Sequence, residues 1–427
     1  MKVIWFTNFI LPKVAPLLYQ LPFAKEGWVT GMAEAIERKH DGGITLAIAF
    51  PVPRESDGWA SEMDGVTYYG YYEDTANPDH YDVTVESRIL KILMDFKPDL
   101  VHIFGTEFPH TLAAVTTIAN HSDELGIDTT RILIGMQGCM GPISEHYLDG
   151  VPEKVINKKT FRDIVKFDGL KEQKAKFEAR ALNEMLALKI AGNVTGRTDL
   201  DSKYTAEIDP DVKYYFMNET LRPQFYEGEW NIETKERHRI FLSQANYPIK
   251  GAHYLFKILK RLLMDYPDLS VYVAGDDITK FGTIKEKIKI SGYGKYLKSL
   301  LPDDCTVRFL GSLDAEGMKE QYLKCHVFVN PSTMENSPNS LGEAMLLGVP
   351  CIAADVGGTG SVFRNGSDGI LYEAGNTDEL IKAIRKMFDD RAYAQTMGQQ
   401  ARAHALATHN PDANFERLME IYKSICR

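Results

Sequence analysis

Residues 326–350, HVFVNPSTMENSPNSLGEAMLLGVP, contain the strand, loop and helix that decide the fold. The apolar run at 326–332 is typical of a buried parallel strand, and an apolar helix follows the loop. The loop at 333–339 therefore lies at the carboxyl end of a strand, where doubly wound sheets bind their ligands. Two carboxylates flank the helix start, Glu335 in the loop and Glu343 eight positions later.

This helix start supports two roles for Glu343. In the first, Ser340 is the N-cap and Glu343 closes a capping box, a common device that the local pattern alone favours. In the second, the helix N-terminus offers N–H groups and a positive dipole end to a diphosphate, and Glu343 accepts hydrogen bonds from two ribose hydroxyls. Glu335 would then face the other side of the ligand, although a solvated loop acid also fits the pattern.

Short apolar runs alternate with amphipathic helical runs in two series, which predicts two doubly wound α/β sheets. Strands are expected at 3–8, 44–50, 100–105, 132–137 and 189–196, and again at 239–244, 270–277, 306–311, 326–332 and 350–355. Helices are expected at 30–40, 87–96, 252–266, 315–325 and 378–390.

The two series define the expected domains. An N-terminal Rossmann-like domain over 1–226 is followed by a linker at 227–238, a polar stretch without periodicity. A C-terminal Rossmann-like domain covers 239–404. Residues 405–427 form a C-terminal helix that could pack back on the N-terminal domain.

The composition is that of an ordinary globular protein, with 44% hydrophobic residues, 25% charged residues and a net charge of −10. Such an acidic chain is unlike a nucleic-acid-binding protein. Five dispersed cysteines without a C-x-x-C pair predict reduced thiols in a cytoplasm. Pro12 and Lys13 interrupt the first apolar run, so residues 2–7 are expected to form a buried strand rather than a leader. No uninterrupted apolar stretch reaches the roughly 18 residues of a membrane span.

After the two glutamates, the chain keeps a fixed order of motifs: Ala344-Met345, Gly348-Val349-Pro350, Asp355-Val356-Gly357-Gly358, Asn365-Gly366-Ser367-Asp368-Gly369-Ile370-Leu371 and Asp378-Glu379-Leu380. Together with Glu335-x7-Glu343, this order resembles the E-x7-E region of the family 4 retaining glycosyltransferases. A bare E-x7-E pattern is weakly specific, whereas the ordered run over 326–384 is strongly specific. The resemblance extends over nearly the whole chain, closely at 240–385 and loosely at 1–230.

The resemblance implies the GT-B architecture, in which two Rossmann-like doubly wound domains face each other across a cleft. The nucleotide sugar would be bound mainly by the second domain. Glu343 would hold the ribose hydroxyls, and Glu335 would lie near the donor sugar and the reacting face. The rest of the implied donor site is the backbone around Asn339, Ser340 and Leu341, for the diphosphate, and the cleft-lining turn at Gly357 and Gly358.

Lys250-Gly251 follows the first strand of the second domain and resembles the lysine–glycine step of the family. There the ammonium would neutralise the leaving diphosphate; an exposed lysine before a turn glycine is the alternative. The family usually places an arginine a few residues earlier, where this chain has Gln244, an amide without charge. Arg197 or Arg222 could replace that arginine, and a surface ion pair is an equal alternative for both. Arg222 is also a candidate acceptor or sugar contact.

The first domain resembles the family more loosely. Gly27 matches the glycine-rich loop that opens the first long helix, where a missing Cβ lets the backbone approach a sugar or phosphate. Gln137 stands where the family commonly has a histidine near the donor sugar, so no histidine-dependent role is implied, although an amide can bond a sugar hydroxyl. Glu107 and His110 follow the strand at 100–105, a position that suggests contact with the acceptor.

Other motifs do not favour metal or nicotinamide chemistry. The D-x-D pattern at 199–201 follows a strand and is expected to cap a helix. No His/Cys cluster has metal spacing, and no G-x-G-x-x-G follows the first strand. The expected reaction uses no metal and no cofactor, with the nucleotide sugar as co-substrate. The lysine-rich segment 154–189 could rest on anionic lipid, but the acids interspersed in it favour a solvated helix face.

The sequence therefore predicts a retaining glycosyltransferase of the hexosyltransferase type, cytoplasmic or peripheral at the inner face of the membrane. It would move a sugar from a nucleotide-diphosphate donor, such as a UDP or GDP sugar, to a carbohydrate or lipid-linked saccharide acceptor. The family suggests a role in bacterial surface polysaccharide assembly. Two alternatives remain open: a nucleotide-sugar 2-epimerase, for which no acid–base pair is evident, and a non-catalytic nucleotide-sugar-binding subunit, which Gln137 and Gln244 keep possible.

Overall fold

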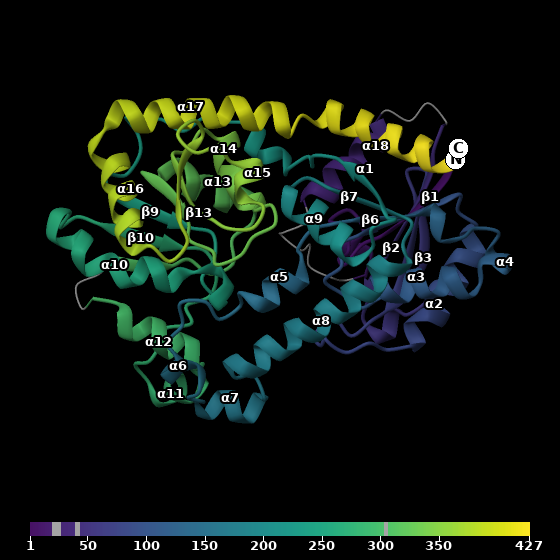
Figure 1. Ribbon diagram of the computed structural model, residues 1–427, viewed down its shortest axis with the longest axis horizontal. Coiled ribbons are helices and arrows are strands. Elements are labelled where there is room, and N and C mark those ends of the chain that lie inside the picture. Colours follow the sequence, from purple (N-terminus) through teal and green to yellow (C-terminus); the bar gives the residue numbers. More distant parts are fainter. Residues whose placement is uncertain (19–26, 39–42, 303–305) are drawn as a thin grey trace. The chain divides into compact units, whose positions relative to one another are not determined.

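The computed structural model describes residues 1–18, 27–38, 43–302 and 306–427, which form two compact α/β units (Figure 1). The first unit comprises Met1–Gly141, Lys176–Thr220 and His409–Arg427. The second comprises Pro142–Ala175 and Leu221–Thr408. Each unit is built around its own mostly parallel sheet, so the α/β doubly wound class expected from the sequence is confirmed.

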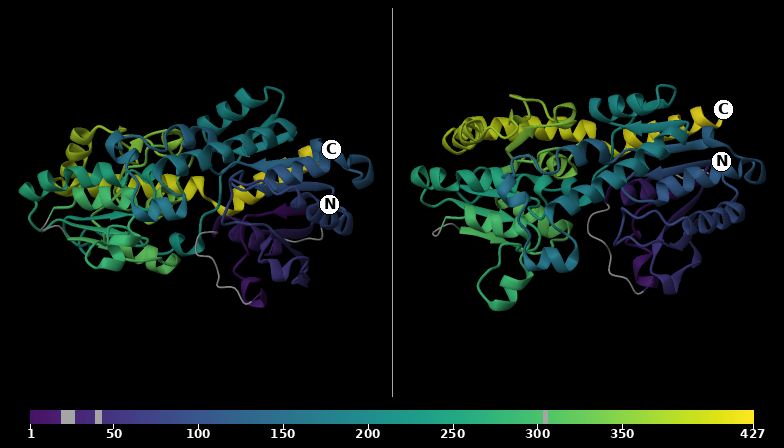
Figure 2. Two further views of the ribbon diagram at one scale, coloured as in Figure 1. Left: turned by 90° about the horizontal axis from the view of Figure 1, so that it is seen from below. Right: turned by 60° about the horizontal axis from the view of Figure 1, so that its bottom comes forward.

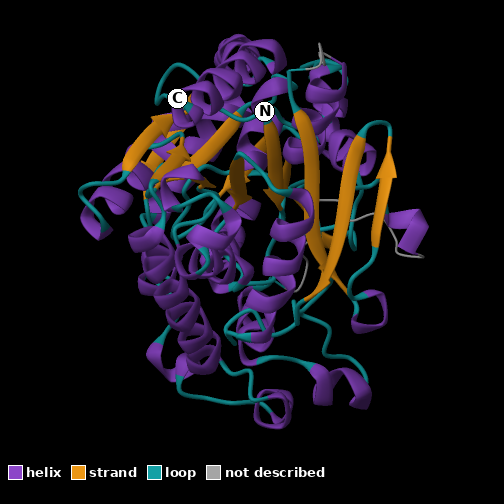
Figure 3. Ribbon diagram, turned by 90° about the vertical axis from the view of Figure 1, so that its right-hand side faces the viewer, coloured by secondary structure: helices purple, strands orange, loops and turns teal. Residues whose placement is uncertain are grey.

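The sheet of the first unit has the strand order β3-β4-β2-β1-β5-β6-β7-β8. Figure 3 shows the strands in orange and the helices that flank them in purple. Its strands are β1 (Lys2–Phe6), β2 (Thr45–Val52), β3 (Ala60–Met63), β4 (Val66–Tyr72), β5 (Leu100–Phe104), β6 (Ile132–Gly135), β7 (Asn193–Gly196) and β8 (Lys213–Phe216). Only the β3–β4 pair is antiparallel among the described strands of this sheet. That hairpin turns through Asp64 and Gly65, whose φ angles of 52° and 78° suit a two-residue hairpin loop.

Two cores cover the two faces of this sheet, because successive residues of β1 point to opposite sides. Ile4 and Phe6 belong to the core under α2 (Thr84–Phe96) and α3 (His110–Asn120). Trp5 belongs to the core under α1 (Gly27–Arg38) and α18 (Pro411–Cys426). The Trp5 indole N–H donates to the Tyr422 hydroxyl at 2.8 Å, which holds the C-terminal helix beside the N-terminal strands (Figure 2).

The second unit has six parallel strands in the order β11-β10-β9-β12-β13-β14. They are β9 (Arg239–Leu242), β10 (Ser270–Val273), β11 (Thr306–Phe309), β12 (Val327–Asn330), β13 (Cys351–Asp355) and β14 (Gly369–Glu373). Its main helices are α10 (Ala252–Asp265), α12 (Gly292–Leu300), α13 (Ala315–Lys324), α14 (Asn339–Leu346), α16 (Thr377–Asp389) and α17 (Arg391–Thr408). The strand order reverses between β9 and β12, which makes the crevice outside their carboxyl ends the expected ligand site.

Further elements complete the two units, including the long helix α8. The α-helices are α4 (Ser122–Leu125), α5 (Met140–Glu145), α6 (Glu153–Ile156), α7 (Phe161–Lys166), α8 (Leu170–Ile190), α9 (Asp199–Ile208), α11 (Ile284–Lys289) and α15 (Thr359–Val362). The 3-10 helices are η1 (Ala15–Leu18), η2 (Arg54–Ser56), η3 (Thr129–Arg131), η4 (Pro223–Tyr226) and η5 (Pro248–Lys250). Strands β3, β4, β8 and β14 lie outside the strands expected from the sequence.

The units differ from the expected domains at residues 142–175, which belong to the second unit rather than to one N-terminal domain over 1–226. Contacts with the second unit explain this grouping. The Thr333 hydroxyl donates to the His146 carbonyl at 2.9 Å, and a ring nitrogen of His253 lies 3.0 Å from the Asp149 carbonyl oxygen. Leu170 joins the apolar core of the second unit.

The expected linker at 227–238 is also part of the second unit. Trp230 is buried, its backbone N–H donates to the Leu347 carbonyl at 2.7 Å, and its indole N–H donates to the Cys325 carbonyl at 2.8 Å. One buried indole fixes this stretch, although most of the residues around it are polar. The C-terminal stretch 405–427 contains the end of α17 and the whole of α18, and α18 belongs to the first unit.

Candidate active site

Lys250 and Glu335 meet at the point where the strand order of the second unit reverses. Lys250 ends η5, after β9, and Glu335 lies in the loop after β12. The Lys250 ammonium contacts Glu335 Oε1 at 2.7 Å, and the Ser332 hydroxyl donates to the same oxygen at 2.7 Å. The side chains of Lys250 and Glu335 are 31% and 13% exposed. The two residues expected to be catalytic therefore form one partly buried ion pair.

Gly251 explains why the lysine–glycine step has this form. Its φ is +65°, a left-handed conformation that favours glycine. A Cβ at this position would lie 1.7 Å from the carbonyl oxygen of Pro331, in the loop after β12. The absence of a side chain lets the two loops touch, and this contact places Lys250 beside Glu335.

A third loop joins the pair. The backbone N–H of Gly358, in the turn after β13, donates to the Glu335 carbonyl at 3.0 Å. Gly357 before it has φ +52°. The glycine turn, the loop after β12 and the lysine step thus converge at one edge of the sheet. Gln244 lies two residues after β9, in the loop that leads to Lys250, and it is half-buried.

The capping box expected at Ser340 and Glu343 is wrong. Helix α14 begins at Asn339 after Pro338, and no side chain caps it. Pro338 is the N-cap and Ser340 is already the second helical residue, so Glu343 lies two residues too far along to close a box. The Leu341 N–H, expected to hold a diphosphate, donates to the Pro338 carbonyl at 3.0 Å.

Glu343 instead forms a bidentate ion pair with Arg222. Arg222 Nε and Nη2 donate to the two carboxylate oxygens at 2.7 and 2.8 Å, and the side chains are 13% and 6% exposed. The Arg222 guanidinium also lies 4.7 Å from the ring centre of Phe225. Burial raises the pKa of Glu343, and Arg222 opposes that rise. The surface ion pair considered for Arg222 is therefore a mostly buried one, and its carboxylate is Glu343.

In the first unit, three expected site residues follow neighbouring strands. Gln137, after β6, donates to Glu219 through Nε2. Arg197, after β7, is 4% exposed and contacts Glu219 Oε2 at 2.9 Å. Glu107, after β5, accepts a hydrogen bond from the Gly138 N–H at 2.8 Å. The surface ion pair considered for Arg197 is thus a buried one, and its carboxylate, Glu219, was not among the expected residues.

His110 is also buried. Its Nδ1 lies 2.8 Å from Glu73 Oε2, and the two side chains are 1% and 3% exposed. Within the described part of the chain, His110 Nε2, Glu73 Oε1 and the Tyr71 hydroxyl have no hydrogen-bond partner. Burial, with Glu73 nearby, raises the pKa of Tyr71 well above its usual value. These three atoms are unsatisfied polar groups, for which a ligand or water is the usual partner.

Glu184 on α8 is a further carboxylate of this unit. Burial raises its pKa to about 7, although the hydroxyls of Thr106 and Tyr204 both donate to it. The Met140 N–H donates to Oε1 at 2.8 Å. The acids interspersed in the lysine-rich segment 154–189 suggested a solvated helix face, but only 1% of Glu184 is exposed. To predict its burial, one would have to know which face of α8 packs against the rest of the unit.

The D-x-D pattern has the structural role expected of it. Asp201 forms a capping box with Thr198 at the start of α9, and the Tyr214 hydroxyl donates to it at 2.5 Å. No group of three or more His, Cys, Asp or Glu side chains in the described residues could hold a metal ion. Gly27 is the first residue of α1, and the loop before it, at 19–26, lies outside the described residues.

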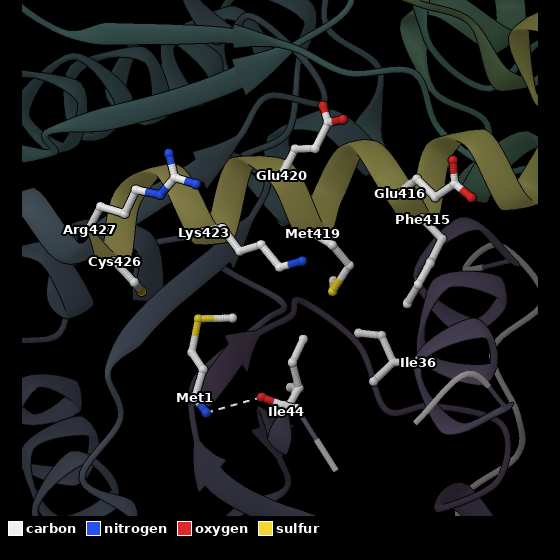
Figure 4. A pocket seen from close by; sticks show the side chains of 11 residues that line it. Met1, Ile36, Ile44, Phe415, Glu416, Met419, Glu420, Lys423, Cys426 and Arg427 are labelled. Atoms are coloured by element: carbon white, nitrogen blue, oxygen red, sulfur yellow. Dashed lines mark hydrogen bonds between the residues drawn. The ribbon is translucent and has the colours of Figure 1, made fainter. Parts of the chain in front are cut away.

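A separate cavity of about 800 Å³ lies in the first unit, at the amino ends of β1 and β2 (Figure 4). Side chains of α18, including Met419 and Lys423, line it opposite Met1 and Ile44. None of the expected site residues lines it, because they follow the carboxyl ends of the strands. No helix among the described residues is long and apolar enough to cross a membrane.

Comparison with known proteins places these sites in a family context. Residues 224–404 match a family model described as glycosyl transferases group 1. YtcC of Bacillus subtilis is 28% identical over 203 residues, 47% of this chain and 48% of that protein. The UDP-Gal:alpha-D-GlcNAc-diphosphoundecaprenol alpha-1,3-galactosyltransferase of Escherichia coli is 29% identical over 96 residues, 22% of this chain and 24% of that protein. The chain thus spans about half or less of the length of these relatives.

Two solved structures match along their full length. Sucrose-phosphate synthase from Thermosynechococcus elongatus has 14% identity and a TM-score of 0.67, with 100% of this chain and 99% of that chain covered. HepE from Anabaena, solved with UDP-glucose, has 16% identity and a TM-score of 0.62, with 99% and 100% covered. The chain therefore has the GT-B fold of two Rossmann-like domains, and its residues 224–404 match the glycosyl transferases group 1.

Proposed function

We propose that this chain is a retaining glycosyltransferase that moves a sugar from a nucleotide-diphosphate donor to a carbohydrate or lipid-linked saccharide acceptor. The observation that carries the proposal is the Lys250–Glu335 pair at the strand-order reversal of the second unit. A cation held there without deep burial can leave its carboxylate and neutralise a diphosphate as the glycosidic bond breaks. The chemistry would consist of positioning and leaving-group stabilisation, with no covalent enzyme intermediate.

Donor binding would use Glu343 without breaking its pair with Arg222. A carboxylate has about four lone-pair sites, and Arg222 occupies one on each oxygen. Two ribose hydroxyls can therefore donate to the remaining sites. In this arrangement Arg222 keeps Glu343 ionised and oriented, and so serves as a positioning residue. Backbone N–H groups in the first turn of α14 would meet the diphosphate.

The acceptor would bind the first unit, where Glu107, Gln137 and His110 follow strand ends. Carboxylate, amide and imidazole groups suit a polyhydroxy acceptor, because each can bond a hydroxyl. The name of the Escherichia coli relative includes a diphosphoundecaprenol-linked acceptor, which supports a lipid-linked saccharide and a role in surface polysaccharide assembly. Such an acceptor would bring the protein to the inner face of the membrane.

The test is incubation of the purified chain with a panel of UDP-, GDP- and dTDP-sugars, followed by chromatography of nucleotides and sugars. Without an acceptor we expect slow hydrolysis to nucleoside diphosphate and free sugar; with an acceptor, nucleoside diphosphate should form faster and the sugar should appear on the acceptor. Lys250→Met should slow both reactions by about 100- to 1,000-fold, whereas Lys260→Met, at a matched exposed lysine on α10, should not change them. Formation of an epimeric nucleotide sugar would identify a 2-epimerase instead. Tight binding without turnover across an acceptor panel would identify a non-catalytic subunit.

A further inference from the structure

Exposed apolar side chains gather on two short helices of the second unit, α7 and α11. Six of the fourteen large apolar side chains that are exposed in the described residues lie there. Their exposed fractions are 48% to 79%: Phe161, Ile164, Val165, Phe167, Ile284 and Ile288. Single exposed apolar residues are normal, whereas a contiguous group marks an interaction surface.

The two helices form one surface. Helices α7 and α11 are in contact (Figure 1), and the Gly292 N–H, after α11, donates to Asp163 Oδ2 on α7 at 2.9 Å. Residues far apart in the sequence therefore lie on adjacent helices. We call the six side chains, with the lysines of α7 and α11, the basic apolar surface.

The acidic residues of both helices are used within the structure. Asp163 is 2% exposed and closes a capping box with Thr160. Glu286 closes a capping box with Thr283. Every other residue of α7 and α11 is apolar or basic. Arg162 pairs with Asp163 and Asp168 at 3.2 and 2.8 Å, which leaves the lysines as the exposed basic residues: Lys166, Lys285, Lys287 and Lys289. The surface is therefore positive within a chain whose net charge is −10.

Phe167 is the C-cap of α7 and exposes an aromatic ring at its end. Its φ of +49° is the left-handed conformation that often ends a helix. The Phe167 N–H donates to the Asp163 and Ile164 carbonyls, and the Asp168 N–H donates to the Asp163 carbonyl at 3.0 Å. These bonds complete the helix end, whereas the Phe167 side chain is 79% exposed.

We propose that the basic apolar surface docks on an anionic lipid bilayer. Lysines around apolar and aromatic side chains are the composition of interfacial membrane helices, because the ammonium groups meet anionic headgroups while the apolar groups enter the acyl boundary. A protein partner fits less well, because protein interfaces are depleted of lysine. This proposal is independent of the proposed function, since lipid binding can be measured without any sugar transfer.

The experiment is flotation of the full chain with two vesicle types, phosphatidylcholine alone and an equal mixture with phosphatidylglycerol. We expect binding to the mixed vesicles only, weakened by salt. The double variant Phe167→Ser/Ile284→Ser should bind at least tenfold more weakly. Lys285→Glu/Lys287→Glu should bind at least about 30-fold more weakly, because each lysine near an anionic surface contributes roughly a factor of five.

Matched variants separate this surface from general effects. Met264→Ser changes an 83% exposed side chain on α10, and Lys382→Glu changes an exposed lysine on α16. Both should bind vesicles like the wild type. All four variants should keep the wild-type melting temperature, because the side chains are exposed. Equal binding to both vesicle types, equal losses in the matched variants, or a dimer in light scattering that only the surface variants dissociate would overturn the proposal.

Discussion

Replacing Arg222 by methionine tests whether its charge keeps Glu343 functional. Methionine preserves the apolar contact with Phe225 but removes both hydrogen bonds to Glu343. Removing one partner of a buried ion pair costs about 3–5 kcal/mol. Arg222 is 13% exposed and Glu343 only 6%, so solvent can relieve part of this cost and we expect about 3 kcal/mol.

The cost should depend on pH in a defined direction. Burial already raises the pKa of Glu343 in the folded chain, and without Arg222 nothing opposes that rise. The folded state then binds the proton more tightly than the unfolded state. Stability therefore falls as pH rises above the ordinary carboxyl range. The Arg222→Met variant should lose more stability, relative to the wild type, at pH 8 than at pH 5.

Urea unfolding followed by tryptophan fluorescence measures this difference, and Trp230 reports on the second unit. Isothermal titration with the nucleoside diphosphate that binds the wild type measures the second consequence. Loss of hydrogen bonds to an ionised acceptor, about 1.5–3 kcal/mol, corresponds to roughly 10- to 150-fold weaker binding. Binding should recover partly at higher pH, where the carboxyl loses its proton.

The double variant Arg222→Met/Glu343→Gln provides the control. Its stability loss should be clearly smaller than the sum of the two single losses, because no unpaired charge remains. Additive losses, or an Arg222→Met cost that is the same at pH 5 and pH 8, would refute the idea that Arg222 acts on Glu343 through charge.

Three further outcomes are expected from the structure. Gly251→Ala should lower the free energy of unfolding of the second unit by several kcal/mol, as measured by thermal unfolding. Gly366 is also left-handed, at φ +74°, but no atom lies within 4 Å of its Cβ position. Gly366→Ala should therefore cost only about 1–2 kcal/mol. Glu184→Gln should stabilise the chain by on the order of 3 kcal/mol at pH 8 and remove the loss of stability between about pH 4.5 and 7, because the pKa of Glu184 is raised to about 7. Lys250→Met should lower the transfer rate by about 100- to 1,000-fold. It should change the free energy of unfolding by less than about 1 kcal/mol, because the ion pair with Glu335 is partly exposed. A loss of transfer that is fully explained by unfolding would contradict a catalytic role.

Local sequence patterns predicted most of the sheet strands because each buried strand is itself an apolar run. The same patterns missed β4, whose sequence VTYYGYY is rich in aromatic residues rather than in aliphatic ones. They also missed its hairpin with β3, although Asp64-Gly65 is a strong turn signal. The segment 142–175 could not be assigned from its own pattern, because its place depends on contacts with residues about 100 positions away.

The site was predictable where the chemistry is local. The lysine–glycine step and Glu335 each follow a strand, and the topology brings them together. The partner of Glu343 was not predictable, since Arg222 lies 121 residues before it. A capping box was the local solution for Glu343, but the helix starts two residues too early for it, with Pro338 rather than Ser340 at the N-cap. Glu184 looked solvated because it belongs to the acids interspersed in the lysine-rich segment 154–189, whereas its own side chain is buried.

Charge distinguishes the two units and suggests how they divide the substrates. In the second unit, Lys250 and Arg222 each meet one carboxylate, so a diphosphate that approaches finds cations already in place. In the first unit, the carboxylates of Glu73, Glu107 and Glu219 follow strand ends, and Arg197 pairs with Glu219. Such a set repels a diphosphate but bonds hydroxyl groups. We therefore expect a nucleoside diphosphate to bind the second unit alone and a neutral saccharide to bind the first. The reason is that the carboxylates of the first unit repel an anionic diphosphate.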